Sequence, residues 1–135
     1  MRAWNWLERL NATIEAASNE AFDYGSANCA LFAADCVDAV LEDSHRGDEL
    51  RAMFSTAREA VKVLRDVGGI EAAVTERLGP PVAWPRLCRG DIALVETAEG
   101  PGLGVCLGHV IACRGAGAEL AYVPLHYASK GWRVE

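Results

Sequence analysis

The first half of the chain carries apolar residues at the three- and four-residue steps that are typical of amphipathic helices. Such steps occur near the N-terminus at Trp4, Leu7, Leu10 and Ile14. They predict a helix over residues 2–17, and a second apolar stripe predicts another helix that begins near Cys29. Two shorter helices are expected over residues 48–66 and 70–78, because a Gly-Gly pair and a Gly-Pro-Pro run follow them.

The second half has the pattern of strands. After Pro85, β-branched and aliphatic runs alternate with Gly-rich turns, which is typical of an antiparallel meander. The expected strands are Asp91–Thr97, Leu103–Cys113 and Glu119–Leu125, with a short strand or tail at Val134. Helices followed by strands predict one α+β domain, with a helical part over residues 1–80 and a sheet part over residues 86–135.

Composition narrows the class of protein. The chain has 135 residues, 51% hydrophobic and 24% charged, which is typical of a globular domain with a core. Its net charge of −6 and the absence of a basic stripe argue against nucleic acid. The chain has neither a long apolar span nor a polybasic patch, so we expect no membrane insertion. Five irregularly spaced cysteines and no visible targeting segment predict free thiols in a reducing cytoplasm.

A thiol lies where a catalytic nucleophile is favoured. Cys29 follows the Tyr24–Ser26 turn and begins the second helix, with Asn28 as the expected N-cap. Unpaired N–H groups and a partial positive charge at a helix N-terminus stabilise the nucleophilic thiolate. The alternative is a small buried hydrophobe, as expected for Cys36 two turns further on. Position alone favours this second interpretation.

A candidate base lies within the second expected strand. His109 follows Gly108, and its strand face would also carry Val105, Leu107, Ile111 and Cys113. That face is expected to point toward the helical layer, where the imidazole could hydrogen-bond a thiol. The alternative is a core histidine that a backbone carbonyl satisfies. We expect His45 in a solvated loop, and His126, just after the third strand, fits either interpretation.

A metal centre is not expected. The candidate ligands would be Cys88, Cys106, His109 and Cys113. Zinc needs ligands that converge on one point, whereas residues 106 and 109 of a strand face opposite sides. The chain has no CxxC pair, and no helix follows Gly100–Gly104 to complete a phosphate loop. We therefore expect neither a metal nor a cofactor.

The order of these motifs resembles the NlpC-type cell-wall cysteine hydrolases, a compact papain-like family. Asn28-Cys29-Ala30-Leu31-Phe32 stands where that family has Asp-Cys-Ser-Gly, and Phe22-Asp23-Tyr24-Gly25 is similar to its upstream Tyr and Gly. Arg89-Gly90-Asp91 and the following strand match its Pro-Gly-Asp strand, and His109-Val110-Ile111-Ala112 matches its His-Val-Gly-Ile strand. The resemblance covers residues 20–125.

The resemblance implies a papain-like NlpC-type fold and hydrolysis of amide bonds in a peptidoglycan stem peptide. Cys29 would attack the carbonyl, and His109 would take and return the proton. The N–H of Cys29 and Tyr24 would stabilise the oxyanion, with Asn28 and Asp91 in support.

This sequence departs from the family's pattern at two points. The family's Ser-Gly is missing after the nucleophile, and its third polar residue, which orients the histidine, falls at Ala121. Three other residues could take that role: His126, Glu119 or Asp91. Without such a partner the tautomer of His109 is not fixed, so an inactive descendant that keeps the fold is an alternative.

The whole string also resembles small proteins encoded in the tail-gene clusters of phages and prophages, through its Trp-rich start and its Trp132-Arg133-Val134 ending. This likeness implies synthesis in the bacterial cytoplasm and incorporation into a tail, with a peptidoglycan peptide or tail proteins as partners. A competing interpretation is a non-enzymatic tail or tail-assembly protein, in which tryptophans mark interfaces: Trp4, Trp6, Trp84 and Trp132. A third is a small-molecule amidase or acyltransferase.

Overall fold

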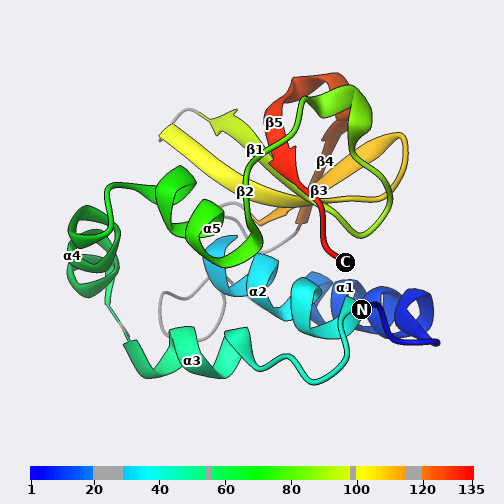
Figure 1. Cartoon of the computed structure of the whole chain (residues 1–135), viewed down its shortest axis with the longest axis horizontal. Helices are drawn as coiled ribbons and strands as arrows, with labels where there is room; N and C mark the ends of the chain where they lie inside the picture. The colour runs from blue at the N-terminus through cyan, green and yellow to red at the C-terminus, as the bar shows by residue number, and fades with distance from the viewer. Residues whose placement is uncertain (20–28, 54–55, 98–99, 115–119) are drawn as a thin grey trace.

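The computed structural model describes residues 1–19, 29–53, 56–97, 100–114 and 120–135. Its helices lie on one side of an antiparallel sheet, which confirms the expected α+β class (Figure 1). The helices are α1 (Trp6–Ser18), α2 (Cys29–Val40), α3 (Arg46–Met53), α4 (Ala57–Asp66) and α5 (Ile70–Leu78), with the 3-10 turns η1 (Trp84–Arg86) and η2 (Leu125–Tyr127). The strands are β1 (Ile92–Thr97), β2 (Gly100–Cys106), β3 (Val110–Arg114), β4 (Leu120–Pro124) and β5 (Ala128–Trp132).

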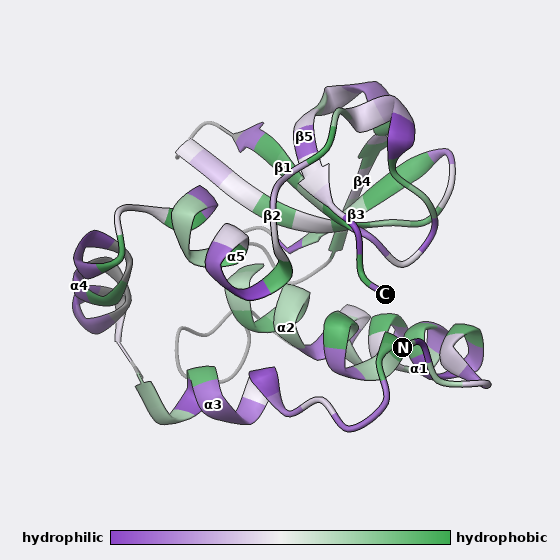
Figure 2. Cartoon of the chain, in the orientation of Figure 1, coloured by the Kyte–Doolittle hydropathy of each residue, from purple (hydrophilic) through white to green (hydrophobic). Residues whose placement is uncertain are grey.

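The central helix of the fold is α2, which begins at Cys29 as the sequence predicts. It lies between α1 and the sheet, and most of its length is apolar (Figure 2). Its buried side chains are Leu31, Phe32, Ala33, Ala34, Cys36, Val37, Ala39 and Val40. Apolar residues all round are expected of a helix that is covered on both sides.

The first helix begins four residues later than predicted, at Trp6. The residues before it run along the end of α2 instead, where Arg2 forms an isolated bridge with Leu41 and the Ala3 N–H donates to Val40 O across 2.8 Å. A tertiary contact thus replaces the first helical turn, although the apolar spacing would allow that turn.

The single helix predicted over residues 48–66 is two helices, α3 and α4. The first begins at Arg46, because the Asp38 carboxylate of α2 accepts the N–H groups of Arg46 and Gly47 at 2.8 and 2.9 Å. The second has Thr56 as its N-cap, whose hydroxyl accepts the Glu59 N–H at 3.2 Å. Side-chain acceptors at helix starts therefore set both boundaries.

The sheet has the strand order β4-β3-β2-β1-β5. Strands β1 to β4 form the expected antiparallel meander, and β5 returns to pair with the free edge of β1. The single strand predicted over Leu103–Cys113 is wrong, because a tight turn at residues 107–109 separates β2 from β3. Gly108 has φ +107° there, which a side chain would disfavour. The last strand begins at Ala128 rather than near Val134.

The two faces of the sheet belong to two apolar clusters. The face toward α2 includes Ile92, Leu94, Leu103, Val105 and Ala112. The opposite face carries Leu87, Ala93, Val95, Cys106, Ile111 and Ala128. The sheet is thus apolar on both sides, and the helical layer covers only the first.

The four tryptophans divide between core and surface. Trp132 is fully buried, and its indole N–H donates to Thr75 Oγ1 of α5 across 3.1 Å. Trp6 packs against the apolar cluster on the α2 side of the sheet, with the Arg2 guanidinium 4.4 Å from its ring centre. Trp4 is 90% exposed and Trp84 is 37% exposed. None of the described helices has the length and apolar character needed to cross a membrane.

Candidate functional site

Cys29 occupies the first position of α2 and is half-buried. A thiol at this position is close to the unpaired N–H groups of the helix start. Tyr24 and Asn28, which the resemblance places beside it, lie outside the described residues, as does Glu119.

The neighbour that Cys29 influences electrostatically is a second thiol, Cys113 of β3. Burial, as the larger cause, and the nearby charge of Cys29 together raise the pKa of Cys113 to about 11. A thiol with a high pKa stays protonated at neutral pH, so Cys113 cannot act there as a base toward Cys29.

His109 does not occupy the position that the sequence predicts for it. It lies in the turn between β2 and β3, where its side chain is exposed and its carbonyl accepts the Leu125 N–H at 3.0 Å. The turn also changes which residues share a face: Val105 belongs to the α2 cluster, whereas Ile111 packs on the opposite side. The expectation that one strand face directs His109 toward the helices is therefore wrong.

Cys29 and His109 lie at opposite ends of α2. A helix of this length spans about 18 Å. Three hydrogen bonds connect its C-terminal end to the turn that holds His109: Ala3 N to Val40 O (2.8 Å), Arg2 Nη1 to Arg89 O (2.9 Å) and Arg89 Nε to Leu107 O (3.0 Å). The N-terminal end of α2 carries Cys29, so the structure does not bring this thiol and imidazole together.

The other histidines do not replace His109. His126 is exposed in η2, where its ring meets Tyr127 edge-on with centroids 5.0 Å apart. His45 is exposed before α3, as expected. The sequence has three histidines, so every imidazole of the chain is exposed. Ala121, at the third position of the family's pattern, is exposed on β4 opposite Cys113.

The described contacts of Asp91 hold segments of the chain together, and none of them is made to the Cys29 thiol. The Asp91 side chain is fully buried. Its carboxylate accepts hydrogen bonds from Arg2 Nη2 (3.0 Å), Val134 N (3.0 Å) and Cys88 N (2.8 Å), and Arg133 Nε lies 3.1 Å away. The carboxylate therefore joins both ends of the chain to the turn before β1.

The remaining cysteines differ in their exposure. Cys36 and Cys106 are buried, and burial raises the pKa of each thiol. Cys88 is exposed. Within the described ranges, no three His, Cys, Asp or Glu side chains are grouped as a metal site requires.

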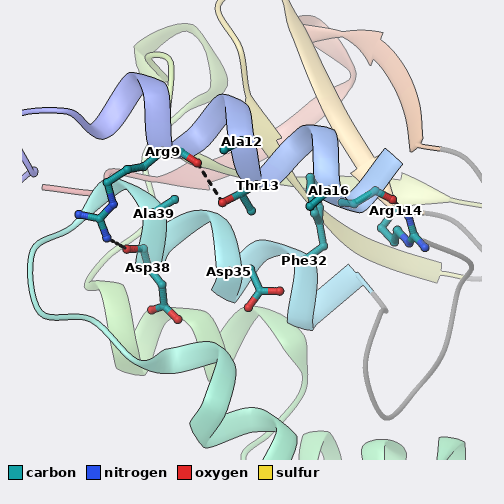
Figure 3. A pocket seen from close by; sticks show the side chains of 10 residues that line it. Arg9, Ala12, Thr13, Ala16, Phe32, Asp35, Asp38, Ala39 and Arg114 are labelled. Carbon is teal, nitrogen blue, oxygen red and sulfur yellow. Dashed lines mark hydrogen bonds between the residues drawn. The ribbon is translucent and has the colours of Figure 1, made fainter. Parts of the chain in front are cut away.

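A pocket of about 530 Å³ opens between α1 and α2 (Figure 3). Its apolar lining is the ring of Phe32 and a series of small side chains: Ala12, Ala16, Ala17 and Ala39. Its polar lining is Arg9, Thr13, Asp35, Asp38 and Arg114. A concave, mostly apolar surface with a few polar groups is typical of a small-ligand site.

Both carboxylates of the pocket already bind donors of the chain. Arg51 donates to both oxygens of Asp35, at 2.9 and 2.7 Å. Asp38 accepts the Ser44 hydroxyl at 2.5 Å in addition to the N–H groups that begin α3. These contacts hold α3 against α2, and Gly47 permits them, because a Cβ there would collide with Asp35.

The two arginines of the pocket lie near its opposite ends (Figure 3). Arg9 Nη2 donates to the Asp38 carbonyl at 2.8 Å. Arg114 is buried, and its guanidinium donates to the Ala17 carbonyl at the end of α1. The sequence pattern does not predict this pocket, because the pocket depends on how two helices pack. The spacing of Arg9, Thr13 and Ala16 along one face of α1 was the available signal.

Fold and site define an α+β protein with a half-buried thiol at a helix start and a separate pocket between its first two helices. The chain belongs to the family described as Domain of unknown function (DUF6950), whose model matches residues 1–134. No curated protein matches it.

Proposed function

We propose that the chain is a non-catalytic protein of NlpC-type fold that acts in a phage tail or its assembly through protein contacts. The observation that carries this proposal is the separation of Cys29 and His109 at the two ends of α2. Thiol hydrolysis needs a base within hydrogen-bond reach of the sulfur, and all three histidines of the chain are exposed. The same requirement argues against a small-molecule amidase or acyltransferase.

Exposed apolar side chains at the N-terminus support a contact function. Met1 is 86% exposed, Trp4 is 90% exposed and Leu7 is 39% exposed. Aromatic residues exposed in this way are enriched at the centres of protein interfaces. The proposed place in a tail rests on the likeness of the whole sequence to proteins of tail-gene clusters. The proposed NlpC-type fold rests on the order of the Cys29, Asp91 and His109 motifs.

A digestion experiment tests the non-catalytic part of the proposal. The full chain and its Cys29→Ala variant are incubated with purified peptidoglycan, and newly released amino groups are counted. We expect the same background from both proteins. Release by the wild type that the variant lacks would contradict the proposal and restore the hydrolase.

A further inference from the structure

We infer that the pocket between α1 and α2 binds the free terminal carboxylate of a peptide with small side chains. This inference rests on the proposed function, because it gives the chemistry of a partner that is bound and not cleaved. The pocket lies along residues 9–17 of α1, about 12 Å of helix, and its volume suits a short peptide end.

The hydrogen-bond donors that remain available in the pocket belong to an arginine, Arg9. The carboxylates of Asp35 and Asp38 are occupied by Arg51, by Ser44 and by the first N–H groups of α3. Arg9, by contrast, makes a single side-chain hydrogen bond to the described residues, and a guanidinium has five N–H donors. An acceptor with negative charge therefore fits Arg9, and a carboxylate can bind its fork in a bidentate manner.

The two aspartates also decide between anions. A phosphate monoester has a charge near −2 at neutral pH, so Asp35 and Asp38 on the same wall would repel it more than a singly charged carboxylate. The lining suits small apolar side chains on the ligand, because Ala12, Ala16, Ala39 and Phe32 offer them an apolar surface.

A peptide carboxylate has two sources, the C-terminus of a partner protein and the end of a cell-wall stem peptide. N-acetyl-L-alanyl-L-alanine represents the first source, and N-acetyl-D-alanyl-D-alanine the second. Each is titrated into the full chain while backbone amide resonances are followed by NMR. We expect saturable shifts confined to residues 9–17 and 32–39, and the stereochemistry that binds tighter identifies the source.

Three control probes isolate the carboxylate. The C-terminal amides of both dipeptides and inorganic phosphate should leave these resonances unmoved at the same concentrations. Arg9→Gln should weaken dipeptide binding about tenfold, because a charge-assisted hydrogen bond is lost. The matched control is Arg58→Gln, which removes an exposed arginine from α4 and should bind as the wild type does.

A second variant covers the case in which Arg9→Gln weakens the packing of α1. Ala16→Leu keeps the Arg9 bond to Asp38 and fills the pocket from an exposed helix position, so it should also abolish binding. The inference is overturned if neither dipeptide shifts the pocket resonances, or if the amides bind equally well. If the dipeptide binds and is then cleaved in the NMR tube, the proposed function fails while the pocket assignment stands.

Discussion

Arg2 Nη2 donates to Asp91 Oδ1 across 3.0 Å, and this bond connects the start of the chain to the turn before β1. The same carboxylate oxygen accepts the Val134 N–H, and Arg2 Nε donates to Val134 O at 2.8 Å. One buried carboxylate thus joins residues near the two ends of the chain. Its role is structural, although the sequence motif that contains it resembles part of a catalytic family.

Replacing Asp91 with Ala should lower the free energy of unfolding by about 3 kcal/mol. This loss is at the lower end of the range that is usual for breaking a buried ion pair, because Arg2 and Arg133 are partly exposed and can be solvated. Urea unfolding followed by tryptophan fluorescence measures the change. Asp48→Ala, an exposed position on α3, is the control, and equal stability of the two variants would contradict the structural role.

Gly47→Ala should destabilise the packing of α3 against α2. The new Cβ would meet Asp35 Oδ1, and Arg51 Nη1 lies 2.9 Å from the same point. We expect a loss of about 1 to 3 kcal/mol, as for other overpacked positions. Ala52→Ser, at an exposed position of the same helix, should change little, and thermal unfolding compares the two.

The thiol of Cys113 should titrate near pH 11, because burial and the charge of Cys29 both raise its pKa. Its reference value is 9.0, so the unfolded chain loses this proton first. Stability from this group is therefore complete below pH 9 and is lost as the pH rises toward 11. Alkylation rates against pH, with mass spectrometry to separate the five cysteines, measure the titration.

Cys29→Ser should lower the pKa of Cys113, because it removes one of the two causes of the shift and leaves burial in place. Cys88→Ser is the matched control, since Cys88 is exposed and does not contribute to this shift. A pKa of Cys113 that is the same in the wild type and both variants would show that the two thiols do not interact.

The sequence predicts the elements whose pattern is local. The apolar stripe that begins at Cys29 gives α2 its start, and the aliphatic run after Asp91 gives β1. Both patterns consist of apolar side chains that the element itself buries, so the local sequence is enough to predict the element.

The candidate site was less predictable, because it depends on one turn. Leu103 to Cys113 is apolar apart from His109 and two glycines, and only the Gly108-His109 pair indicates that two strands are joined there. A prediction without this turn places His109 on a buried strand face, whereas His109 lies in an exposed hairpin. The alternation of side chains along one continuous strand then gives His109 the wrong neighbours. The position of His109 relative to α2 follows from long-range bonds of Arg2 and Arg89, which no local pattern contains.

The most direct test of the account is the alkylation rate of Cys29 as a function of pH, in the wild type and in His109→Ala. Because Cys29 and His109 lie at opposite ends of α2, we expect the two titration curves of Cys29 to coincide. Arg89→Ala, at the same end of the molecule as His109, controls for an indirect change in the hairpin. A Cys29 pKa that rises when His109 is removed, and does not rise in Arg89→Ala, would reveal a thiolate–imidazolium pair and contradict the non-catalytic account.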